Sequence, residues 1–219
     1  MDTENQAVFD YQNIAIVVAH PDDEVLWAGG MMLMHTHRNW RIATLCRASD
    51  PDRAPRFRRV LEETGAYGDM GDLDDGPEQT PLPRDAVDEF VGKALAANHW
   101  DLVITHAPWG EYTRHRRHEE VSASVARLWG HNVFQTNALW MFAYSDDGGK
   151  RLPEAIRDAH VKFGLRAPIW KAKYRLITEV YGFSPDSWEA RTTPCWEAFW
   201  CFDAPGDYTR WFNKETRLR

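Results

Sequence analysis

Short, continuous apolar runs alternate with amphipathic stretches along the chain. Residues 13–19 are almost wholly apolar, as expected of a strand that is buried on both faces. Helical spacing follows the acidic run at 22–24, and acidic residues are typical of a first helical turn. The same patterns predict further strands at 41–46, 101–106, 138–144 and 197–202, and helices at about 55–66, 84–98, 114–129 and 169–181. This alternation predicts a three-layer α/β domain with a mostly parallel sheet flanked by helices.

Size and charge narrow the class of protein. The chain has 219 residues without a repeat or linker, so we expect one domain spanning residues 1–219. Its 26 basic and 33 acidic residues give a formal charge of −7, which argues against broad nucleic-acid binding. The longest apolar run, 25–34, is far shorter than the roughly 18 residues of a membrane span. Residues 1–12 lack the basic start of a secretory signal, so we expect a cytoplasmic protein.

Cysteines and the acidic segment suggest no metal site of their own. Cys46, Cys195 and Cys201 form no Cys-x-x-Cys pair, so a thiolate cage is not expected and buried free thiols are the simpler interpretation. The acidic stretch 69–78 fails as a calcium-binding EF-hand, because proline stands where the loop needs glycine and glutamate. We therefore interpret that stretch as a surface loop.

Two polar clusters follow predicted strands and carry the candidate chemistry. His20, Asp22 and Asp23 come directly after the first strand, where ligands bind in open α/β sheets. His115 and His118 follow the strand at 101–106 and share a helix face. In a parallel sheet both clusters lie at the same edge. Two imidazoles and one carboxylate would leave an open fourth position, as catalytic zinc sites do.

Simpler explanations exist for each cluster alone. The acidic run could only complement a helix dipole, and the histidine pair, with its arginines at 116 and 117, could be a solvated basic face. The coincidence of both clusters at one sheet edge favours a site. The remaining histidines outside recognisable motifs are expected to be structural or surface residues: His35, His37, His99, His131 and His160.

Several motifs together resemble those of the PIG-L/LmbE family of zinc-dependent de-N-acetylases. They are the run Ala-His-Pro-Asp-Asp-Glu at 19–24, the Gly29–Gly30 pair, the run Thr-His-Ala-Pro-Trp-Gly-Glu-Tyr at 105–112, His-x-x-His at 115–118, the Arg59–Glu62 spacing and Asp75-Gly76. The similarity spans roughly residues 14–125, with a weaker echo around 173–183. It implies a Rossmann-like, LmbE-like fold and removal of an N-acetyl group from an N-acetylglucosamine-type amino sugar or its conjugate.

The resemblance also implies a role for each site residue. His20, Asp23 and His118 would bind Zn²⁺ or another divalent metal, and Asp22 would be the general base. A protonated His115 would stabilise the tetrahedral intermediate. Zinc with an open position lowers the pKa of bound water to about 7, which supplies hydroxide near neutral pH. The chain departs from the family at Arg117, where an acidic residue is common, and by one extra residue before His115.

Substrate contacts are less defined by the sequence. Arg47, Arg53 and Arg56 follow the second strand and could bind sugar hydroxyls or a phosphate, or else form an exposed helix face. Trp109 is a candidate for stacking on a sugar ring or for anchoring its loop.

Two other functions stay open at this stage. The protein could be a metal-bearing sugar-binding protein without turnover, or another metal hydrolase such as a phosphoesterase. The C-terminal tryptophans could cover the core, cap the pocket or form a subunit contact in a homo-oligomer: Trp188, Trp196, Trp200 and Trp211.

Overall fold

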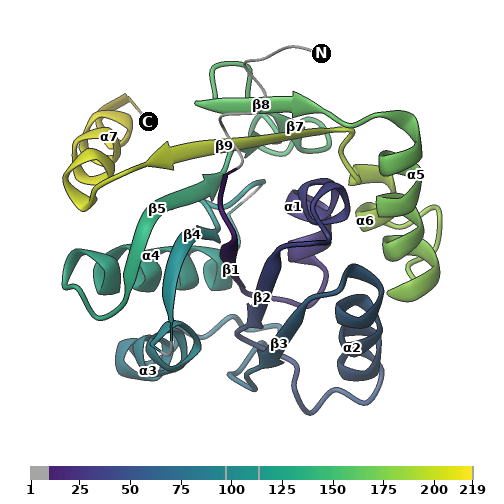
Figure 1. The fold of residues 1–219 in the computed structure, drawn as a ribbon, viewed down its shortest axis with the longest axis horizontal. Helices are drawn as coiled ribbons and strands as arrows, with labels where there is room; N and C mark the ends of the chain where they lie inside the picture. The colour runs from purple at the N-terminus through teal and green to yellow at the C-terminus, as the bar shows by residue number, and fades with distance from the viewer. Residues whose placement is uncertain (1–9, 97, 113, 219) are drawn as a thin grey trace.

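A seven-stranded sheet forms the centre of the protein. The computed structural model describes residues 10–96, 98–112 and 114–218. The strands lie in the spatial order β3 (Tyr67–Met70), β2 (Asn39–Thr44), β1 (Asn13–Val18), β4 (His99–Thr105), β5 (Gln135–Phe142), β9 (Trp196–Phe202) and β8 (Val161–Gly164) (Figure 1). The first five pair in parallel, whereas β9 is antiparallel to both β5 and β8. A small separate ribbon joins β6 (Tyr144–Ser145) to β7 (Glu154–Ala155).

Helices cover both faces of the sheet and make the three layers that the sequence predicts. One layer holds α1 (Asp23–Met34), α2 (Arg53–Thr64), α5 (Ala167–Arg175) with a following π-helical turn (Leu176–Val180), and α6 (Trp188–Thr192) (Figure 1). The other layer holds α3 (Arg84–Leu95), α4 (Arg116–Gly130) and α7 (Pro205–Leu218). Within the described residues, no helix has the length and apolar character needed to cross a membrane.

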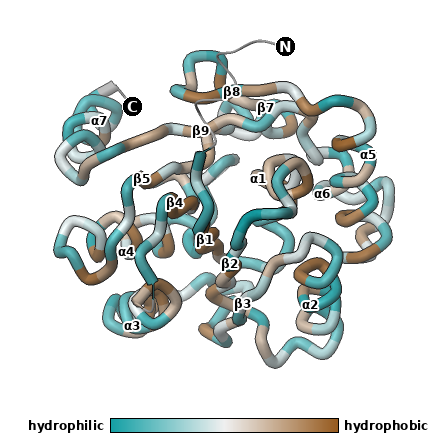
Figure 2. Tube along the Cα trace, in the orientation of Figure 1, coloured by the Kyte–Doolittle hydropathy of each residue, from teal (hydrophilic) through white to brown (hydrophobic). Residues whose placement is uncertain are grey.

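Strand β1 shows why the sheet is covered on both sides. Ile14, Ile16 and Val18 enter one hydrophobic cluster, and the alternate residues Ala15 and Val17 enter the other. Side chains of a strand point to opposite faces in turn, so one continuous apolar run serves two cores. Figure 2 shows hydrophobic stretches, in brown, in the neighbouring strands β4 and β5.

A buried ion pair attaches α1 to the antiparallel end of the sheet. Glu197 of β9 accepts the backbone N–H groups of Gly30 and Met31 at 2.7 and 2.8 Å, and Lys173 of α5 donates to it at 2.7 Å. A Cβ atom at Gly30 would lie 2.4 Å from Leu165 and 2.9 Å from the Glu197 carboxylate. Glycine at this position therefore permits the close approach of α1 to β9.

The main differences from the sequence prediction lie at the sheet edges and in the last third of the chain. The predicted strands and helices are confirmed with boundaries shifted by a few residues, but β3, β6, β7, β8, α6 and α7 were not predicted. The stretch 69–78, expected to be only a surface loop, begins inside β3. Residues 1–9, which carry most of the segment used to argue against a secretory signal, lie outside the described residues, as does residue 97 of the helix predicted at 84–98.

The strand order places the candidate motifs at one edge. Strands β1 and β4 are adjacent, and the chain continues from them toward opposite sides of the sheet. Such a switch point is where ligands bind in open α/β folds, outside the carboxyl ends of the strands. The first cluster follows β1 directly, and the second lies at the start of α4, the helix that follows β4.

Candidate active site

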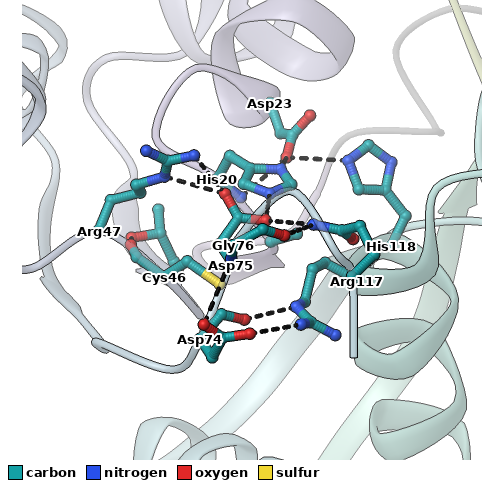
Figure 3. A network of polar contacts seen from close by, with 12 residues as sticks. His20, Asp23, Cys46, Arg47, Asp74, Asp75, Gly76, Arg117 and His118 are labelled. Carbon is teal, nitrogen blue, oxygen red and sulfur yellow. Dashed lines mark hydrogen bonds and ion pairs between the residues drawn. The ribbon is translucent and has the colours of Figure 1, made fainter. Parts of the chain in front are cut away.

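Three of the predicted metal ligands meet at this edge of the sheet. His20 follows β1, Asp23 begins α1, and His118 lies in the first turn of α4 (Figure 3). Asp23 Oδ2 lies 3.2 Å from His20 Nδ1 and 3.4 Å from His118 Nε2. Ligand atoms around a tetrahedral zinc ion, with Zn–N distances of about 2.0–2.1 Å, lie about 3.3 Å apart. Each of these two spacings suits ligands of one ion. The three residues do not form a group in which all ligand atoms lie within 4.8 Å of one another, so binding one ion requires their side chains to move closer together.

His118 is the common member of two ligand groups. Its imidazole lies with those of His20 and His115 in one group, and with Asp23 and His106 in the other, with one ligand atom per residue and all atoms of a group within 4.8 Å. His118 Nε2 is buried and has no hydrogen-bond partner among the described residues. Burial also lowers the pKa of His118, which favours a neutral ring. Its Nδ1 atom lies 2.7 Å from the Glu111 carboxylate, so the proton is on Nδ1 and the lone pair is on Nε2. A lone pair facing a carboxylate oxygen is unfavourable unless a cation lies between them, so the donor set fits a divalent metal.

Asp75 holds the other side of the His20 ring. Its Oδ1 atom lies 3.2 Å from His20 Nε2, and its Oδ2 atom accepts from the Arg47 guanidinium at 2.5 and 2.9 Å (Figure 3). Burial opposes ionisation of Asp75, but the hydrogen bond and charge of His20 and the hydrogen bonds from Gln79 and Arg47 together outweigh it and lower the pKa of the carboxyl. The sequence placed Asp75 only within a matching motif, without a role.

Asp22 lies beside the predicted metal ligands, and its carboxylate makes no hydrogen bond to them. Its backbone has φ 139° and ψ −28°, a region that favours glycine, and strain of this kind is common at active sites. Its carboxylate lines the cavity, 3.7 Å from the Arg53 guanidinium. Burial and the adjacent Asp23 carboxylate raise the pKa of Asp22 well above its usual value. These properties suit a group that accepts a proton and later returns it.

A buried chain of hydrogen bonds supports the Asp22 backbone. The Asp22 N–H donates to Glu24 Oε2 at 3.0 Å, and the Tyr181 hydroxyl donates to Glu24 Oε1. Burial raises the pKa of Glu24 to about 7, although both hydrogen bonds act against this rise. Tyr181 follows the π-helical turn, and such turns are frequent at functional sites.

His115 reaches the site but is not protonated as we expected. Its ring lies 4.8 Å from that of His20 and 4.5 Å from that of His118, measured between centroids. Burial and these two imidazoles lower the pKa of His115 to about 3, so the ring is neutral. A neutral ring still offers one N–H donor.

Arg117, which directly precedes His118, is a buried structural cation. The guanidinium is fully buried and donates to the carbonyls of Asp74 and Thr80 at 2.6 and 2.9 Å and to Glu120 at 2.6 Å. Arg117 thereby attaches the loop that carries Asp75 to α4 (Figure 3).

A cavity of about 240 Å³ opens beside these residues. Its lining combines the catalytic candidates with charged and aromatic side chains: His20, Asp22, Asp23, His115, Arg47, Arg53, Asp75, Tyr112, Trp188 and Glu189. Among the predicted substrate-binding residues, Arg47 and Arg53 line the cavity. Arg56 instead donates to the carbonyl of Tyr181 and to Asp52.

The aromatic side chains that line the cavity do not include that of Trp109, which we expected to stack on a sugar ring or to anchor its loop. Tyr112 and Trp188 line the cavity with their rings 4.6 Å apart. Trp109 packs against Trp211 and Phe212 of α7, with ring centroids 5.5 and 5.8 Å away. Tyr112 was part of a matching motif, whereas no sequence signal distinguished Trp188 from the other C-terminal tryptophans.

Comparison with known proteins identifies the fold. No protein-family model matches the sequence, and no curated protein matches it. The structure is similar to N,N'-diacetylchitobiose deacetylase from Pyrococcus horikoshii, with TM-score 0.65 and 16% identity over 93% of this chain and 88% of that one. It is also similar to GalB, the 4-carboxy-2-hydroxymuconate hydratase from Pseudomonas putida KT2440, with TM-score 0.60 and 16% identity over 82% of this chain and 83% of that one. The zinc-inhibited form of teicoplanin deacetylase Orf2 is similar with TM-score 0.53 and 13% identity over 77% of this chain and 83% of that one. The chain therefore has the LmbE/PIG-L-type fold that its sequence motifs predict.

Proposed function

We propose that the protein is a metal-dependent hydrolase that removes the N-acetyl group from an N-acetylglucosamine-type amino sugar or its conjugate. The proposal depends on one observation: the unpartnered His118 Nε2 atom and His20 Nδ1 both lie within 3.4 Å of the Asp23 carboxylate, and the Asp22 carboxylate lines the cavity beside them. Deacetylases of chitobiose and teicoplanin share the fold, which supports this choice of reaction.

Each side chain has a distinct task in the proposed reaction. A divalent ion held by His20, Asp23 and His118, zinc or another, would polarise the amide carbonyl and acidify water. Asp22 accepts a proton as a water oxygen forms a bond to the carbonyl carbon, and returns it to the amine as the C–N bond breaks. The products are acetate and a free amine. Neutral His115 donates its ring N–H to the oxygen on which negative charge develops.

The cavity suggests how the sugar is held. Its volume of about 240 Å³ is below the roughly 300–1,000 Å³ of pockets that enclose drug-sized ligands. This size suits one sugar ring with its acetamido group, while the rest of a conjugate stays outside. Arg47 and Arg53 offer donors to hydroxyl groups, and Tyr112 and Trp188 offer aromatic surface to a ring face.

The test combines metal analysis with acetate release from a panel of N-acetylated amino sugars. Asp22→Asn keeps the side-chain shape but removes the base, so acetate release should fall by about 10²–10⁴-fold with the metal content unchanged. His118→Ala should instead lower the metal content. Retained turnover in Asp22→Asn would reject the base, and full metal occupancy in His118→Ala would reject the ligand.

The same assay separates the two rival functions. Release of phosphate from phosphoesters without release of acetate would identify a phosphoesterase. Sugar binding without any hydrolysis, by protein with bound metal, would identify a binding protein.

A further inference from the structure

A buried carboxylate connects two imidazoles behind the candidate metal ligands. Glu111 Oε2 lies 2.9 Å from His106 Nδ1 and 2.7 Å from His118 Nδ1, while Oε1 accepts the Ala107 N–H at 2.9 Å. Glu111, His106 and His118 are all fully buried. The two rings are stacked, with centroids 3.8 Å apart and planes inclined by 19°. Solvent therefore cannot replace any of these hydrogen bonds.

The backbone decides which nitrogen of His106 carries the proton. The Ala19 N–H, which can only donate, points at His106 Nε2 at 2.9 Å. His106 Nε2 must accept this bond, so the ring proton lies on Nδ1 and is donated to Glu111. The lone pair of His106 Nε2 is thus already used. We expect no metal bond from His106, although it lies among the potential ligands.

Glu111 decides the tautomer of His118 in the same way. Oxygen Oε2 of an ionised carboxylate only accepts, so the His118 proton lies on Nδ1. The unprotonated Nε2 then faces Asp23 Oδ2 at 3.4 Å. A carboxylate behind a metal-binding imidazole fixes the ring and makes it a stronger ligand, and losing such a partner costs about 10–100-fold in metal affinity.

We propose that Glu111 is a positioning residue that fixes the tautomer and orientation of His118, and that His106 holds Glu111 in place without binding metal itself. The inference rests on the proposed function, because it concerns the same metal centre. Arg117 stands where the resembled family commonly has an acidic residue, directly before His118, so a carboxylate for this ring has to come from elsewhere. Here the carboxylate nearest the ligand comes from seven residues earlier in the chain.

The first test needs no variant. In the metal-free wild-type protein, ¹⁵N NMR of the histidine rings should show His118 protonated at Nδ1 and unprotonated at Nε2. A His118 ring protonated at Nε2, or one that exchanges between tautomers, would overturn the proposal.

The second test measures zinc affinity by competition with a chromophoric chelator. Glu111→Gln keeps the shape of the side chain but replaces one acceptor oxygen by an NH₂ donor. That NH₂ group must then face either the Ala107 N–H or the imidazole N–H groups, which are also donors. Zinc affinity should fall by about 10–100-fold. The matched control is Glu197→Gln, which alters another fully buried carboxylate that accepts backbone N–H groups away from the site. This control should lose stability and keep its zinc affinity.

A third variant tests the role of His106. His106→Gln supplies an oxygen for the Ala19 N–H and an N–H for Glu111, so zinc affinity should stay close to that of the wild type. A loss as large as that of His118→Ala would make His106 a ligand and overturn the proposal. Equal zinc affinity in Glu111→Gln and the wild type would also overturn it. A wild-type protein that binds no zinc would instead contradict the proposed function, and the NMR test would still decide the tautomer.

Discussion

The hydrogen bond between Tyr181 and Glu24 gives a prediction whose size depends on pH. Tyr181→Phe removes the hydroxyl that donates to Glu24 Oε1 and leaves that oxygen buried without this donor. Glu24 is fully buried, and burial raises its pKa from the ordinary 4.5 to about 7. The Glu24 carboxyl therefore keeps its proton to higher pH in the folded protein than in the unfolded protein. Its contribution to the free energy of unfolding falls as pH rises from about 4.5 to about 7.

The magnitude follows from the two pKa values. A rise from 4.5 to about 7 corresponds to a cost of about 3 kcal/mol once the carboxyl is ionised. Without the Tyr181 hydroxyl the pKa rises further, because a hydrogen bond to the charged form is lost. Such a bond contributes about 1.5–3 kcal/mol, against about 1 kcal/mol for a neutral pair. The loss of unfolding free energy should grow from about 1 kcal/mol near pH 5 to about 2–3 kcal/mol near pH 8.5.

Urea unfolding of chelator-treated protein at both pH values measures this difference without a contribution from bound metal. The control is Tyr144→Phe, because the Tyr144 hydroxyl lies 3.2 Å from two backbone carbonyls, which do not titrate. Its loss of stability should be the same at both pH values. An equal loss at both pH values in Tyr181→Phe would refute the reasoning.

Three further predictions concern other parts of the structure. Burial lowers the pKa of His20, but hydrogen bonds to two carboxylates outweigh it and raise the pKa to about 10. Zinc must therefore displace a proton from His20, and zinc affinity should rise about tenfold per pH unit near neutrality. Calorimetry in buffers of different protonation enthalpy measures this release, and binding without it would contradict His20 as a ligand. Arg117→Asp should lower the unfolding free energy by about 3–5 kcal/mol, because it leaves Glu120 without its buried cation; an unchanged urea midpoint would contradict this. Gly30→Ala should lower the unfolding free energy, because its methyl group would meet Leu165 and Glu197. Gly130→Ala has open space around it and should raise the unfolding free energy by up to about 1 kcal/mol. Equal effects on the urea midpoints would refute the packing argument.

The layered fold was predictable because its central strands are unusually apolar. The runs at 13–19 and 101–106 became β1 and β4, whose residues alternate between two cores. Strand β3 was missed because its sequence, Tyr-Gly-Asp-Met, has no apolar run and only partial burial. Its pairing with β2 holds it in an extended conformation that its own residues do not favour.

The grouping of the two polar clusters was predictable from the rule that parallel strands end at one edge. The motif resemblance then selected His20, Asp23 and His118 as the predicted ligands within that group. The supporting residues were not predictable, because their partners are distant in the chain: Tyr181 lies 157 residues from Glu24. Glu111 stood in a matching motif, but its two imidazole partners appear only once the loop is folded.

The unusual backbone of Asp22 has a practical consequence for engineering. Glycine would adopt its φ of 139° without penalty, whereas other residues lose about 1–3 kcal/mol in such conformations. A library of variants selected only for heat resistance would therefore enrich glycine at this position and discard the proposed base. Selection schemes for this scaffold need a counter-screen for turnover at every round.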